Sequence, residues 1–171
     1  MNGKTIAVKA ILKKNKETTI PLGGRCMDPL FLAGDCAKIH DTQKAIIGGI
    51  YLFQLPTGEV AAHRLIGREG GKLMMKGDRS RGFEIIPSTD LLGEVTHVKL
   101  LGTKDWICIQ RAPFTKTVSF FSKKIAKDKC IKKSENFIEK RIVSIFMKLL
   151  LLYGDSLRAQ WKKAAANRKN N

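Results

Sequence analysis

The side chain best placed to do chemistry in this sequence is Cys26, within the segment GRCMDPLFLAGD at residues 24–35. Pro29 fixes its own backbone and pushes the residue before it into an extended shape, and Gly34-Asp35 is a turn signal. The segment is therefore expected to be a kinked loop that leads into a strand and presents one side chain on a rigid base. A thiol in that setting could act as a nucleophile. The alternative is a small buried apolar residue, which is the usual role of a free cysteine.

The pattern Cys26-Met27-x-Pro29 followed by Gly34-Asp35 resembles the nucleophile box of signal peptidase I and its LexA-like relatives, which have serine where this chain has cysteine. Further segments resemble later boxes of the family in the family's order. They are VAAHRLI at 60–66, which resembles the box with the general base, LMMKGD at 73–78, which resembles T-K-G-D, and LLGEV at 91–95, which resembles the strand that closes the domain. The resemblance covers residues 18–98.

The resemblance implies hydrolysis of a peptide bond, with Cys26 as nucleophile and His63 as general base. The thiolate is the reactive form of cysteine, and a neighbouring imidazolium would stabilise it. Many family members have lysine at the His63 position, and histidine there is similar to the endoplasmic-reticulum and archaeal type. Lys76 is a rival base, but by the alignment of the boxes it belongs to the K-G-D motif.

A third group should orient His63, and the resemblance offers Asp78 or Glu84 for that role. For Asp78 the alternative is a structural aspartate that caps backbone amides in a turn. Arg64, beside the base, is expected either to be structural or to orient the substrate.

The resemblance also implies where a peptide substrate would bind. Gly24 stands where signal peptidases have a serine that helps to bind the oxyanion, so backbone N–H groups such as that of Cys26 remain as donors. Gly24 and Met27 are therefore expected beside the substrate. The apolar stretches 31–32 and 50–53 could line a groove that binds an extended peptide by strand addition.

Frequent turn signals and short β-branched or aromatic runs predict an all-β fold for residues 1–110, a signal-peptidase/LexA-like β core. The expected strands are 18–22, 37–40, 50–55, 59–65, 72–75, 83–87, 92–101 and 105–110, with 50–55 and 59–65 forming a hairpin.

Residues 111–171 form a basic tail. The net charge of the chain is +17; residues 99–171 hold 18 Lys/Arg and 5 Asp/Glu, whereas residues 1–98 hold 14 and 10. An amphipathic C-terminal helix is predicted at 136–153, with a capping-box start at Asn136 and a stop at Gly154. Flanking basic residues and Trp161 suit a helix lying on a membrane surface, and the alternative is a helix packed on the β core or on another protomer.

The remaining features limit the partners and the compartment. The four cysteines include no C-x-x-C pair and no histidine cluster accompanies them, so neither a metal site nor a cofactor is expected. The lysine-rich N-terminus has no apolar run typical of a signal peptide or an anchor, and it is too short and too often interrupted by lysine for a helix-turn-helix. We therefore expect reduced thiols, a cytoplasmic protein that could be peripheral to the inner membrane, and no nucleic-acid binding outside the basic tail.

The sequence thus predicts a signal-peptidase-like endopeptidase that cleaves a precursor peptide or protein with a Cys/His dyad. The alternatives are a binding module that kept the fold and lost activity, and a regulator that acts on a membrane surface or nucleic acid through its basic tail.

Overall fold

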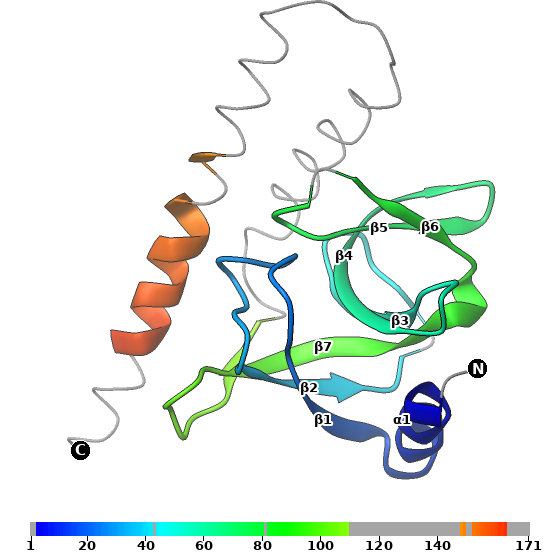
Figure 1. Cartoon of the computed structure of the whole chain (residues 1–171), viewed down its shortest axis with the longest axis horizontal. Helices are drawn as coiled ribbons and strands as arrows, with labels where there is room; N and C mark the ends of the chain where they lie inside the picture. The colour runs from blue at the N-terminus through cyan, green and yellow to red at the C-terminus, as the bar shows by residue number, and fades with distance from the viewer. Residues whose placement is uncertain (1–2, 43, 81, 110–147, 150–151, 164–171) are drawn as a thin grey trace, which may run out of the picture.

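An antiparallel sheet of eight strands organises the chain (Figure 1). The computed structural model describes residues 3–42, 44–80, 82–109, 148–149 and 152–163. Seven strands follow one another across the sheet in the order β1-β2-β7-β3-β4-β5-β6, and β8 pairs with β7. The expectation of a mostly β core is confirmed.

The strands lie within a few residues of the ranges predicted from the turn signals. They are β1 (Glu17–Pro21), β2 (Cys36–His40), β3 (Ile50–Gln54), β4 (Val60–Glu69), β5 (Lys72–Lys76), β6 (Glu84–Ile86), β7 (Leu91–Lys99) and β8 (Ile107–Cys108). The short 3-10 helix η1 (Ser88–Asp90) precedes β7. β3 and β4 form the expected hairpin, with Ile50 opposite Arg64 and Gln54 opposite Val60.

Apolar side chains divide the core into two main clusters. One lies under β2 and β7 and includes Ile39 and Val95, together with Met27 and Phe31 from the loop between β1 and β2. The other lies between β3, β4, β5 and β6 around Tyr51. The loop that carries Cys26 is thus anchored in the first cluster by its own apolar residues, while the Cys26 side chain lies at the edge of that cluster.

The N-terminal helix α1 (Gly3–Asn15) was not predicted. Its lysines break the apolar pattern, so the sequence gives little amphipathic signal. The helix is instead held by tertiary contacts: Thr5 and Leu12 are buried, and the Thr5 hydroxyl donates to the Gly58 carbonyl at 3.1 Å. Packing of this kind supplies most of the stability of short helices in proteins.

The C-terminal helix does not stop at Gly154 as predicted. Residues 148–149 and 152–163 are helical, and the predicted N-terminal part of the helix, like residues 111–147 of the tail as a whole, lies outside the described residues. Gly154 is buried and continues the helix because the helix packs closely at that point. Leu157 and Trp161, on the same face, pack against the first core cluster. The described part of the helix therefore packs on the β core, which was an alternative to a helix lying on a membrane surface. No helix among the described residues is both long and apolar enough to cross a membrane.

Candidate active site

Cys26 lies in the loop between β1 and β2, half-buried, at the start of a turn. Inside this turn the Phe31 N–H donates to the Met27 carbonyl at 3.1 Å, and the Asp28-Pro29 peptide bond is cis. Met27 is buried beside Cys26, so the apolar neighbour fixes the loop and leaves the thiol partly accessible.

A second loop, formed by residues 77–80 after β5, packs directly against Cys26. The Arg79 N–H donates to the Cys26 carbonyl at 2.9 Å, and the Asp78 N–H points at the Met27 sulfur at 3.4 Å. A Cβ atom on Gly77 would lie 2.7 Å from the Cys26 carbonyl oxygen and 3.0 Å from its Cβ. The glycine of the K-G-D segment is therefore needed for the close approach of the two loops.

His63, the expected base, extends from β4, and its side chain forms a hydrogen bond with Cys26. Its imidazole is buried, its ring packs on Phe53 with centroids 5.5 Å apart, and its Nδ1 lies 3.0 Å from Glu84 Oε2. Because Glu84 occupies Nδ1, Nε2 is the nitrogen left for Cys26. Burial alone would lower the pKa of His63, but hydrogen bonds and charge interactions with Cys26 and Glu84 outweigh it and raise the pKa from 6.5 to about 9. The imidazolium is therefore the favoured form at neutral pH.

The two carboxylates that could have oriented His63 occupy different positions. Glu84, from β6, contacts His63. Asp78 instead binds the Arg64 guanidinium with both oxygens, at 2.9 Å from Nε and 2.7 Å from Nη2. Arg64 also donates to the Gly48 carbonyl at 2.7 Å and is only 2% exposed. Asp78 therefore pairs with Arg64 and not with His63, and this ion pair differs from the expected alternative, in which Asp78 caps backbone amides in a turn. The contacts of Arg64 fit its structural alternative.

Lys76, the rival base, is fully buried and donates to the Gly77 carbonyl at 3.0 Å. Burial lowers the pKa of Lys76, and the negative charge of Asp78 offsets only part of this effect. Within the described residues no hydrogen bond joins Lys76 to Cys26, so its amine is not positioned to take the thiol proton.

A groove of about 760 Å³ begins at Cys26 and extends away from it between α1, the end of β1 and the start of β4. Gly24 and Met27 line it as expected, and Arg64 does not. Of the two apolar stretches expected in its wall, both residues of 31–32 line it, but only Leu52 from 50–53 does. The other lining residues are mostly small or aliphatic: Ala7, Val8, Ile20, Pro21, Leu22, Gly23, Gly58, Glu59, Val60, Ala61 and Ala62.

Two strand edges border this groove. Among the described residues β1 pairs only with β2, and β5 pairs with β4 only from Arg64 onward. In the part of the chain that the structure describes, the segment 60–63 of β4 therefore has β3 on one side and no strand on the other. Unpaired edges offer a row of backbone donors and acceptors to an incoming extended chain.

Two groups of residues at the site were missed from sequence. Ala7 and Val8 of α1 form part of the groove wall, and no local pattern identified that helix. Asp28 Oδ2 accepts from Arg25 Nε at 3.1 Å and from Arg79 Nη1 at 2.9 Å, which ties the Cys26 loop to the K-G-D loop. The sequence signal for this second group was the acidic residue next to Pro29 with Arg25 three positions before it, whereas Arg79 is 51 positions from Asp28 and no local pattern pointed to it.

In the part of the chain that the structure describes, no three His, Cys, Asp or Glu side chains converge as they would on a metal ion. The protein-family models contain no match to this chain, and no curated protein matches it significantly. Functional inference therefore depends on the geometry of the site.

Proposed function

We propose that this protein is a signal-peptidase-like endopeptidase that cleaves a peptide bond with a Cys26–His63 dyad oriented by Glu84. The observation that carries the proposal is the position of the buried His63 imidazole between Glu84, 3.0 Å from its Nδ1, and the Cys26 side chain. These two contacts also raise the pKa of His63 to about 9. A protonated His63 beside Cys26 favours an imidazolium–thiolate pair, the active form of cysteine–histidine hydrolases.

The reaction would proceed in two halves. The Cys26 thiolate attacks the scissile carbonyl carbon to give a tetrahedral oxyanion, for which the backbone N–H of Cys26 is the available donor. Collapse of this intermediate breaks the C–N bond, and His63 Nε2 donates its proton to the leaving amine, which leaves a thioester on Cys26. His63 then takes a proton from water, hydroxide attacks the thioester carbonyl, and the acid product leaves with Cys26 regenerated. Glu84 holds His63 by Nδ1 throughout and stabilises its charged form.

The groove supports an extended, largely apolar peptide as substrate. Its walls are mostly small and aliphatic residues, many of them from β1 and β4, and among the described residues β1 and the first part of β4 each pair with a strand on one side only. A peptide strand lying between residues 20–24 and 60–62 could hydrogen-bond to both edges, and its reactive carbonyl would meet Cys26 at the end of the groove.

The arrangement of the four boxes supports the signal-peptidase-like assignment within this mostly β fold. The nucleophile box forms the β1–β2 loop, the histidine box lies on β4, the K-G-D box ends β5, and the L-G-x-V segment begins β7. The first three meet at Cys26, through the contacts of Gly77 and Arg79 and the pairing with His63.

A peptide-binding module without activity is the second candidate. The groove and its free edges do not depend on a working thiol, so binding could persist if Cys26 were inert. The third candidate, a regulator that acts through the basic tail, stays a prediction, because residues 111–147 lie outside the described residues.

Alkylation by iodoacetamide tests the dyad without a known substrate. Cys26 should react faster than the exposed Cys108 at pH 6, and His63→Ala should remove that advantage, since the thiolate loses its counter-ion. His97→Ala, on β7 away from the site, is the control. Equal Cys26 reactivity in the parent and His63→Ala proteins would rule out the dyad.

Cleavage itself is tested by incubating the parent protein with a library of unstructured peptides and identifying new termini by mass spectrometry. Cuts within apolar segments that vanish in Cys26→Ala support the peptidase. Retention of the same peptides without cuts, by parent and Cys26→Ala alike, would favour the binding module.

A further inference from the structure

The C-terminal helix contacts the nucleophile loop at its proline. A Cβ atom built on Gly154 would lie 2.7 Å from Pro29 Cγ and 3.1 Å from Pro29 Cδ. The helix backbone therefore lies directly against the turn that follows Cys26, and only glycine allows that distance without displacing one of them.

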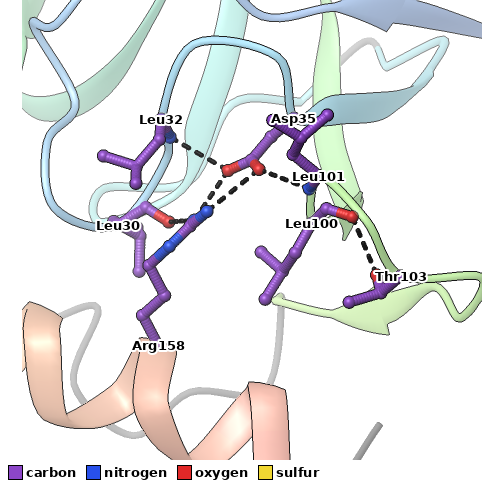
Figure 2. A network of polar contacts seen from close by, with 7 residues as sticks. All are labelled: Leu30, Leu32, Asp35, Leu100, Leu101, Thr103 and Arg158. Carbon is purple, nitrogen blue, oxygen red and sulfur yellow. Dashed lines mark hydrogen bonds and ion pairs between the residues drawn. The ribbon is translucent and has the colours of Figure 1, made fainter.

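One helical turn further on, Arg158 extends into the same loop (Figure 2). Its guanidinium lies 2.6 Å and 3.0 Å from the two oxygens of Asp35 and donates to the Leu30 carbonyl at 3.2 Å. Both side chains are buried, Arg158 at 7% exposure and Asp35 at 0%. Arg158 thus holds the loop through its backbone at Leu30 and through the aspartate that ends it.

Asp35 connects this contact to the sheet. Its oxygens also accept the Leu32 N–H at 2.9 Å and the Leu101 N–H at 2.8 Å, the latter just beyond β7 (Figure 2). The carboxylate therefore fixes three segments at once: the loop, the end of β7 and the C-terminal helix.

The loop depends on such anchors because it lies outside the ladder of the sheet. Cys26 is carried by this loop, whereas His63 is carried by β4, and no strand pairing links the two. The K-G-D loop holds one side of the Cys26 segment through Gly77 and Arg79. The C-terminal helix holds the other side through Gly154 and Arg158.

We propose that the C-terminal helix is a positioning element for the nucleophile loop, with Arg158 as the positioning residue that keeps Cys26 aligned with His63. The inference rests on the proposed dyad. Arg158 does not touch the reacting atoms; it acts through Asp35 and the Leu30 carbonyl. A misplacement of about 1 Å at a reacting group can cost about 100-fold in rate, so a loop held from both sides is needed.

The test compares full-length proteins with Arg158→Met and Lys162→Met, the second removing an exposed cation from the same helix. The readout is the ratio of iodoacetamide labelling at Cys26 to labelling at Cys108, an internal reference in the same protein. We expect Arg158→Met to lower the ratio about tenfold at pH 6 and Lys162→Met to leave it unchanged. Added guanidinium ion, at concentrations too low to denature, should restore part of the ratio in Arg158→Met and have no effect on Lys162→Met.

A second pair of variants covers the outcome in which Arg158→Met does not fold. Gly154→Ala keeps the ion pair but pushes on Pro29. Ser156→Ala, on the exposed face of the same helix, is the control for a substitution to alanine in this segment. A lower ratio in Gly154→Ala alone supports the inference. An unchanged ratio in folded Arg158→Met, or in Gly154→Ala when Arg158→Met is unfolded, overturns it.

His63→Ala separates this inference from the proposed function. If His63→Ala lowers the Cys26 ratio and the helix variants do not, the dyad stands and the positioning role fails. If His63→Ala leaves the ratio unchanged, the dyad itself fails, whatever the helix variants show.

Discussion

His63 and Glu84 meet across a strand that separates them in the sheet. Nδ1 of His63, on β4, lies 3.0 Å from Oε2 of Glu84, on β6, and β5 lies between the two strands. The contact between His63 and Glu84 therefore forms only when β4, β5 and β6 are paired in the correct register. The pKa of His63 thus depends on the assembly of these three strands.

Glu84→Gln should lower the pKa of His63 from about 9 toward its ordinary value of 6.5, because a hydrogen-bonded negative charge is lost. Titration of the imidazole by NMR measures the shift. Glu69→Gln, at the exposed end of β4, should leave the pKa of His63 where it is. A His63 that titrates identically in the parent and Glu84→Gln proteins would contradict the orientation by Glu84.

The raised pKa of His63 also predicts how stability varies with pH. A group whose pKa is higher in the folded state contributes stability that is fully present below pH 6.5 and is lost as pH rises through about 9. The buried imidazole should account for up to about 3 kcal/mol across that window, at about 1.4 kcal/mol per unit. Urea unfolding at a series of pH values measures the free energy of unfolding as a function of pH. The prediction is refuted if this free energy varies as little in the parent as in His63→Ala between pH 6.5 and 9.

Asp78→Asn should destabilise the fold without changing the titration of His63. Asp78 neutralises Arg64, which is 2% exposed, and breaking a buried ion pair typically costs 3–5 kcal/mol. Glu84→Gln should show the reverse behaviour, with a small loss of stability and a large change in the pKa of His63. Denaturant unfolding and NMR titration of both variants decide the roles; a shifted His63 titration in Asp78→Asn would restore Asp78 as an orienting group.

Gly77→Ala should separate the two loops at the nucleophile. Its new Cβ would lie 2.7 Å from the Cys26 carbonyl oxygen, a distance that real Cβ contacts do not show, so the Cys26 loop must move. The labelling ratio of Cys26 to Cys108 should fall about tenfold. Gly82→Ala, where nothing lies within 4 Å of the added atom, is the matched control and should behave as the parent.

Val8→Trp should obstruct the groove from the side of α1. Val8 lines the groove, whereas Ile6 on the same helix is 51% exposed and does not line it. For peptides that the parent cleaves, we expect a KM raised about tenfold or more in Val8→Trp, while Cys26 alkylation is unchanged, since one filled subsite removes about 1–3 kcal/mol of binding. An unchanged KM in Val8→Trp, or an equal rise in Ile6→Trp, would show that the groove is not the binding site.

The strands could be predicted from sequence because their signals are local. Turn dipeptides such as those at Gly58 and Gly70 separate short runs rich in β-branched and aromatic residues, and these runs are strands in the structure. The prediction that Cys26 and His63 lie close together depended on the resemblance to the family's sequence boxes. Such a resemblance relates residues that are distant in sequence, which composition cannot do.

Three features could not be predicted, each because its stabilising contacts are distant in sequence. α1 is held by the buried Thr5 and Leu12 rather than by an amphipathic pattern. The helix continues through Gly154 because that residue packs on Pro29, which outweighs its tendency to end helices. The choice between Asp78 and Glu84 depended on where β5 and β6 place them, which no local rule determines.

The ion pair of Asp35 and Arg158 joins residues 123 positions apart in the chain. During synthesis, the nucleophile loop and its base are both made long before the helix that clamps the loop. Domains begin to fold from the N-terminal side as they emerge, so a partly made chain would contain Cys26 and His63 without their final alignment. Under the proposed mechanism, this contact can form only after the chain has been translated through Arg158, so we expect Cys26 to reach its full reactivity late.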